Sequence, residues 1–167
     1  MKFLRYQFLL LIILGFVSCK EDKDLLPITP LEGTWQYSYY NQDQQFFFIY
    51  QYIFNPDGTM EKSILIRESD TPKILGYYSN ALGTYELRGE TYSEVLERQF
   101  VLALDAYVFY VPKEKLIEVE VTSGFSNNGT LIFSENNRSF ELGFTCNDTP
   151  SGRTTSCQAA ITYKRVD

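Results

Sequence analysis

Apolar and polar side chains alternate along most of this chain, and this period-two pattern decides its fold class. Near the start, Trp35, Tyr37 and Tyr39 share one face of an extended strand, and the residues between them are polar. Similar short runs follow almost to the last residue, separated by turn signals such as NPDGT at 55–59. The sequence therefore predicts an all-β domain of about eight to ten antiparallel strands joined in sequence order.

Some stretches depart from a clean alternation. Residues 46–54 are apolar on both faces, so we expect this strand to be covered on both sides. Residues 91–105 fit a strand, but they also fit a short helix capped by Thr91 or Ser93, and both interpretations stay open. The run AYVFYV at 106–111 predicts a further strand.

The chain begins with the marks of a secreted protein. Two basic residues precede an apolar run that is too short to span a bilayer as a permanent helix. Cys19 then follows a small residue, and this arrangement resembles the bacterial lipobox, whose cysteine receives a diacylglycerol and further acyl chains such as palmitate. The resemblance implies a signal peptide at 1–18, a lipidated Cys19 with its tether at 19–32, and a folded domain at 33–167. Several acyl chains would anchor the protein stably to a membrane.

The residues after the cleavage site bear on location. CKEDKD at 19–24 resembles the signal by which some Gram-negative bacteria export lipoproteins to the outer cell surface. This resemblance implies an outer-membrane protein displayed on the cell surface, with the inward-facing leaflet of the outer membrane as the alternative. The formal net charge of −6 repels polyphosphates, so nucleic acid is a poor candidate partner.

Two further cysteines, Cys146 and Cys157, flank a polar stretch that reads as a turn between two strands. Because disulfides persist outside the cytoplasm, we expect these cysteines to bridge the hairpin. A loop of this size would contribute about 2 to 3 kcal/mol by the chain-entropy estimate.

Catalytic signals are absent from the sequence. The chain has no histidine, which removes Ser-His-Asp and Cys-His catalysis and the commonest metal ligand. We also find no nucleotide-binding fingerprint, and expect neither a metal nor a cofactor. Paired carboxylates are the one enzymatic route left, and Glu118 and Glu120 share a strand face, but their neighbours favour a solvated outer surface. The sequence therefore predicts a protein that is not an enzyme.

Short motifs resemble those of the lipocalin superfamily, especially small lipocalin-like bacterial lipoproteins with a calycin-type barrel. They are LEGTW at 31–35, FNPDGT at 54–59 and GTYEL at 83–87. The resemblance implies an up-and-down β-barrel, with a β-sandwich as the alternative. It also implies that a basic residue of the last strand packs on the Trp35 ring as a cation–π pair; Arg165 has the right parity for this role, and Lys164 is the alternative if the register shifts by one residue.

Two functional hypotheses follow. In the first, the barrel interior binds a small apolar or amphipathic ligand, or its rings simply fill a closed core. The inward aromatic residues expected to line such a site are Trp35, Tyr37, Tyr39, Phe48, Tyr50, Tyr52 and Tyr85.

In the second hypothesis, a filled barrel is a scaffold whose surface contacts a glycan or a protein partner. The contacts would come from Tyr40, Tyr78 and Tyr92, or from loops around Asn127 and Asn136. A cavity favours the first hypothesis, and an exposed aromatic patch on a packed barrel favours the second. The sequence does not determine the oligomeric state.

Overall fold

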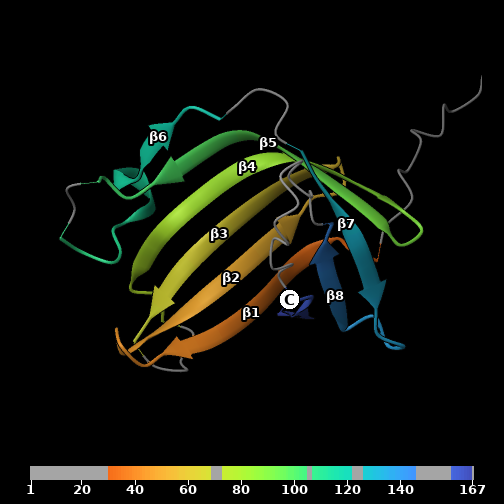
Figure 1. Ribbon diagram of the computed structural model, residues 1–167, viewed down its shortest axis with the longest axis horizontal. Helices are drawn as coiled ribbons and strands as arrows, with labels where there is room; N and C mark the ends of the chain where they lie inside the picture. Colours follow the sequence, from red (N-terminus) through yellow and green to blue (C-terminus); the bar gives the residue numbers. More distant parts are fainter. Residues whose placement is uncertain (1–29, 69–72, 105–106, 122–125, 146–158, 167) are drawn as a thin grey trace, which may run out of the picture.

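The computed structural model describes residues 30–68, 73–104, 107–121, 126–145 and 159–166, and the regular secondary structure in this part of the chain is almost entirely β-strand. Figure 1 shows β1 to β5 as one strongly curved sheet, with β7 and β8 continuing the ring. The elements are β1 (Gly33–Asn41), β2 (Phe46–Phe54), β3 (Thr59–Arg67), β4 (Gly76–Arg88), β5 (Thr91–Val101), a 3-10 turn (Lys113–Lys115), β6 (Ile117–Val119), β7 (Ser126–Phe133), β8 (Ser139–Phe144) and β9 (Ile161–Arg165). The all-β prediction is confirmed.

The strands close into a barrel. Their order is β4-β3-β2-β1-β9-β8-β7-β5, and β5 pairs again with β4, so eight strands complete a ring in which neighbours are antiparallel. The first and last strands meet where Trp35 is opposite Arg165 and Gln36 is opposite Lys164. The up-and-down barrel is thus confirmed over the β-sandwich, and it is compatible with a lipocalin-like fold. Closure leaves most strands without a free edge, which disfavours edge-to-edge aggregation.

The ninth strand, β6, lies outside the ring and pairs with the second half of β5, while β7 takes the first half. Residues 91–101, which the pattern left open between helix and strand, form β5, because strands on both sides supply hydrogen-bond partners. The strand predicted at 106–111 is wrong. Within the described part of that stretch only Val111 pairs, in an isolated bridge with Tyr77.

The physical reason for this difference lies at the rim of the barrel. The ring is already closed at β5, so this stretch has no strand to pair with, and Tyr107 and Val108 are exposed. Phe109 and Tyr110 place their ring centroids 6.4 and 5.9 Å from that of Phe46. The apolar run therefore marked two residues that contact another ring, without showing that they pair with a strand.

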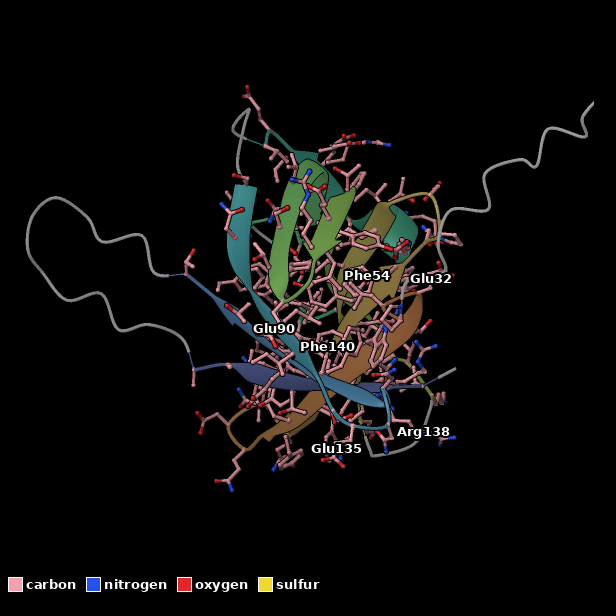
Figure 2. The ribbon with its side chains drawn as sticks, turned by 90° about the vertical axis from the view of Figure 1, so that its right-hand side faces the viewer. Glu32, Phe54, Glu90, Glu135, Arg138 and Phe140 are labelled. Carbon is pink, nitrogen blue, oxygen red and sulfur yellow. The ribbon has the colours of Figure 1, made fainter. Side chains whose placement is uncertain are left out.

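One end of the barrel is filled by side chains. Figure 2 shows Phe54 and Phe140 inside the barrel, among side chains from the surrounding strands. Trp35 is fully buried there, with its ring centroid 4.8 Å from that of Phe140. We call this region the packed end; its buried residues are Leu31, Trp35, Phe54, Met60, Tyr92, Leu131 and Phe140. Each large apolar side chain buried here stabilises the fold by about 1.5 to 3 kcal/mol.

The core starts earlier than the tether boundary at residue 32 suggests. Leu31 is fully buried, and its carbonyl oxygen accepts a 2.7 Å hydrogen bond from Trp35 Nε1. Because an unpaired indole N–H would be costly in this interior, Leu31 completes the packed end.

The outer face of the barrel is partly covered as well. Phe48 and Ile49, which face opposite sides of β2, are both buried, as expected for a strand covered on both sides. Further along the sheet, Lys113 from the 3-10 turn donates a 2.6 Å hydrogen bond to the Glu61 carboxylate on β3. This ion pair fastens the segment between β5 and β6 to the barrel wall.

Candidate ligand-binding site

The half of the barrel opposite the packed end contains three adjoining pockets, which we call together the recess. The largest measures about 620 Å³, lies beside β1 and β9, and adjoins a pocket of about 100 Å³. A third pocket of about 260 Å³ lies at the mouth. The residues that line them are Tyr37, Tyr39, Asn41, Gln44, Phe48, Tyr50, Tyr52, Lys62, Ile64, Tyr78, Leu142, Phe144, Ala159, Ala160, Ile161, Thr162 and Tyr163. Tyr50 borders all three pockets, so they lie side by side around its ring.

The recess exists because the barrel seam is short. β1 pairs with β2 over its whole length, but it pairs with β9 only at Trp35 and Gln36. Beyond that point the two strands no longer pair, and the residues facing the gap from the other side include Ala159 and Ala160. Two small side chains leave space that larger ones would fill.

The structure divides the seven predicted ligand-binding residues between the two halves. Those that line the recess are Tyr37, Tyr39, Phe48, Tyr50 and Tyr52. The other two, Trp35 and Tyr85, lie at the packed end, where the ring centroids of Tyr85 and Phe54 are 4.7 Å apart. The alternation along each strand identified all seven as inward-facing residues. It did not show how far along the barrel axis each side chain lies.

A buried carboxylate lies at the inner end of the recess. Glu94 on β5 is 0% exposed. Its Oε2 accepts hydrogen bonds from the hydroxyls of Tyr52 at 3.2 Å and Tyr92 at 2.9 Å. Its Oε1 accepts from Asn127 Nδ2 at 2.8 Å and from Lys62 Nζ at 3.2 Å. Four donors therefore satisfy this charge in the barrel interior.

Lys62 on β3 reaches the same point from the other side of β4, which pairs with both β3 and β5. Its side chain is 30% exposed, and its Nζ lies 5.1 Å from the Tyr52 ring centroid and 5.4 Å from that of Phe144. Both rings attract the ammonium group and limit where it can go. Sequence analysis missed Lys62 and Glu94. Their signal was an ionisable residue at an inward-facing position of an alternating strand.

The tyrosine hydroxyls of the interior hold their protons strongly. Burial raises the pKa of Tyr50 to about 12, and the neighbouring Tyr39 adds to the shift. Burial first, and then the charge of Glu94, raises the pKa values of Tyr52, Tyr92 and Tyr163 well above the usual range. These groups are neutral hydroxyls near pH 7, able both to donate and to accept hydrogen bonds.

Of the residues proposed for a partner contact, some are exposed and others are buried. Tyr40 and Tyr78 are 46% and 42% exposed near the mouth, and Asn136 is exposed in the turn between β7 and β8. Tyr92, by contrast, is fully buried. Asn127 belongs to β7 and bonds to the buried Glu94, so it is no loop contact.

The remaining predicted residues lie apart from the recess. Arg165 places its guanidinium carbon 4.5 Å from the Trp35 ring centroid, and its Nη2 donates to the Pro30 carbonyl oxygen at 2.7 Å. Glu118 is exposed and makes a two-pronged ion pair with Arg98, whose hydrogen bonds lower the pKa of this carboxyl. Glu120 is exposed too.

The three cysteines, Cys19, Cys146 and Cys157, lie outside the described residues. Among the residues that are described, no helix has both the length and the apolarity to cross a membrane. The same residues contain no group of three or more histidine, cysteine, aspartate or glutamate side chains placed to hold a metal ion.

Comparisons of the chain with protein-family models, with curated proteins and with solved structures each give no match.

Proposed function

We propose that the recess binds a small amphipathic molecule and that the barrel is a binding protein without catalytic activity. The observation that carries this proposal is the division of the interior: packed rings fill one end, and three adjoining pockets occupy the other. A pocket lined mainly by aromatic and aliphatic side chains with a few polar groups is typical of small-molecule sites.

The chemistry of the lining suits a ligand with both polar and apolar parts. The rings of Tyr39 and Phe48 stack with centroids 5.5 Å apart and offer flat apolar faces. Asn41 and Gln44 add amide groups at the mouth. The Gln44 Oε1 atom is buried and has no hydrogen-bond partner among the described residues, so it is free to accept from a ligand donor.

The same proposal includes a membrane anchor at Cys19, by way of an N-terminal tether, on the outer membrane and facing the cell exterior. The described chain starts at the packed end, where the Pro30 carbonyl accepts from Arg165. β1 then runs from Gly33 to Asn41 at the mouth. An anchor before Pro30 would therefore hold the packed end nearer the membrane and leave the mouth of the recess facing away from it.

A fluorescence titration tests the ligand-binding proposal. N-phenyl-1-naphthylamine is neutral and apolar and brightens in apolar surroundings, so it should bind residues 20–167 with a saturable rise in emission. Tyr50→Ala removes the ring that all three pockets share, and we expect it to weaken binding by about tenfold or more. Tyr40→Ala removes an equal ring from the surface near the mouth and is the matched control.

No saturable binding by the unaltered protein would contradict the proposal. Equal weakening by Tyr50→Ala and Tyr40→Ala would contradict it as well, because the probe would then sit on the outer surface.

The exposure of Tyr40 and Tyr78 supports a second candidate function, contact with a glycan or protein partner through the rim of the barrel. The two candidates differ in one measurable respect. A rim contact depends on Tyr40 and is insensitive to filling the recess, whereas ligand binding shows the opposite dependence.

A further inference from the structure

The recess has one charged side chain in its lining. Among the residues that border its three pockets, Lys62 carries a positive charge and the others are uncharged. The chain as a whole is acidic, with a formal net charge of −6, so its general field disfavours anions. Among the residues that border the three pockets, Lys62 is therefore the group that can attract a negatively charged part of a ligand, although it is also ion-paired with the buried Glu94 behind it.

From this arrangement we infer that the ligand of the recess carries an acidic group, such as a carboxylate, and that Lys62 Nζ binds it. This inference rests on the proposed ligand-binding function and names the chemical class of the ligand. It makes Lys62 the residue that determines specificity, while the aromatic walls supply most of the contact area.

The hydrogen-bond balance between Lys62 and Glu94 supports the inference. Glu94 receives four hydrogen bonds, three of them from the neutral groups of Tyr52, Tyr92 and Asn127, so its oxygen atoms depend on Lys62 for only one of the four. An ammonium group has three N–H donors. Of these, Lys62 gives one to Glu94, and the described residues offer no other hydrogen-bond acceptor to the rest.

Accessibility separates the two charges further. The Glu94 side chain is 0% exposed, whereas that of Lys62 is 30% exposed and borders the inner pocket. A ligand entering the recess therefore meets the cation and not the carboxylate. The distances to the Tyr52 and Phe144 rings show that the ammonium is positioned before a ligand arrives, which lowers the cost of ordering it on binding.

The rest of the lining fits the apolar part of such a ligand. Leu142, Phe144 and Ile161 surround Lys62 in the inner pocket, and the largest pocket continues from there past Tyr50. An acid that enters with its charged group first would thus place its hydrocarbon part along apolar and tyrosine surfaces towards the mouth.

The test compares two probes that differ only in the head group. Decanoate and decan-1-ol are each used at pH 7.5 to displace N-phenyl-1-naphthylamine from residues 20–167. We expect decanoate to bind about tenfold more tightly, the factor expected from an additional hydrogen bond to a charged donor. Lys62→Met should bind decan-1-ol as before and lose the preference for decanoate.

Two variants sharpen the comparison. Lys62→Arg retains the charge and should retain the preference. Lys164→Met removes an exposed positive charge from β9 and is the matched control for net charge, so its preference should be unchanged.

Equal affinity for the two probes in the unaltered protein would overturn the inference, and so would a preference that survives in Lys62→Met. If neither probe nor the fluorophore binds, the proposed ligand-binding function itself fails. Retained binding of decan-1-ol by Lys62→Met shows in the same experiment that the variant is folded.

Discussion

Replacement of Glu94 should destabilise the barrel more than any surface substitution. In Glu94→Ala, the hydroxyls of Tyr52 and Tyr92 lose their carboxylate acceptor, and both residues are almost completely buried. Tyr92 keeps only a weak 3.5 Å contact to Met60 Sδ. Each unsatisfied buried donor costs about 1 to 3 kcal/mol. Lys62 and Asn127 also lose a partner, but both are only partly buried and can turn to water. The free energy of unfolding should therefore fall by about 3 to 5 kcal/mol, the range measured when one member of a buried ion pair is removed.

Urea denaturation followed by Trp35 fluorescence measures this loss. In thermal denaturation of a domain of this size, each kcal/mol lost from the free energy of unfolding lowers the melting temperature by about 2 to 4 °C. Glu94→Gln keeps one acceptor oxygen, and the tyrosine hydroxyls can rotate to accept from its amide group, so it should cost less than Glu94→Ala. Glu97→Ala is the control on the same strand, because Glu97 is exposed, and it should stay within about 0.5 kcal/mol of the unaltered protein.

The reasoning is refuted if Glu94→Ala and Glu97→Ala destabilise the protein equally. It is also refuted if Glu94→Gln is the more harmful of the two substitutions at that position.

Further predictions concern alkaline pH, core packing and the cysteines. Because the neutral form of Tyr50 is favoured in the fold, its contribution to stability is complete below its ordinary pKa of 10.0 and is lost as the pH rises towards about 12; urea denaturation at successive pH values should show this fall. Phe140→Ala empties the centre of the packed end and should cost about 3 to 5 kcal/mol in the same denaturation assay. Cys19→Ala should abolish incorporation of radiolabelled palmitate, and unchanged labelling would exclude a lipid anchor there. Peptide mapping without reductant should recover Cys146 joined to Cys157, whereas two free thiols would rule out the bridge.

Much of the fold was predictable, because side chains alternate between the two faces of a strand, and one face of each barrel strand is buried. Tyr52 and Phe54 face the interior because residues two apart in a strand lie on one side, and their partners on neighbouring strands follow the same rule. Where a segment packs without pairing, as at Phe109, the same pattern misleads, because alternation reports contact with apolar surface and not hydrogen bonding.

The candidate site was predictable only in part. The aromatic residues of β1 and β2 were recognisable from parity, but the short seam between β1 and β9 depends on where two strands distant in sequence stop pairing. The four-donor environment of Glu94 brings together residues from β2, β3, β5 and β7. An ionisable residue at an inward position marks Lys62 and Glu94 singly, but no local pattern shows that the four strands bring these residues together.

Native mass spectrometry of the folded domain, purified from the cells that make it, tests the central claim most directly. The account predicts that part of the protein retains a small non-protein molecule of reproducible mass. It also predicts that this mass belongs to an acid and that Tyr50→Ala diminishes the bound fraction. A domain that carries no such mass, and that still takes up no amphipathic acid when one is supplied, would contradict the claim that the recess is a ligand site.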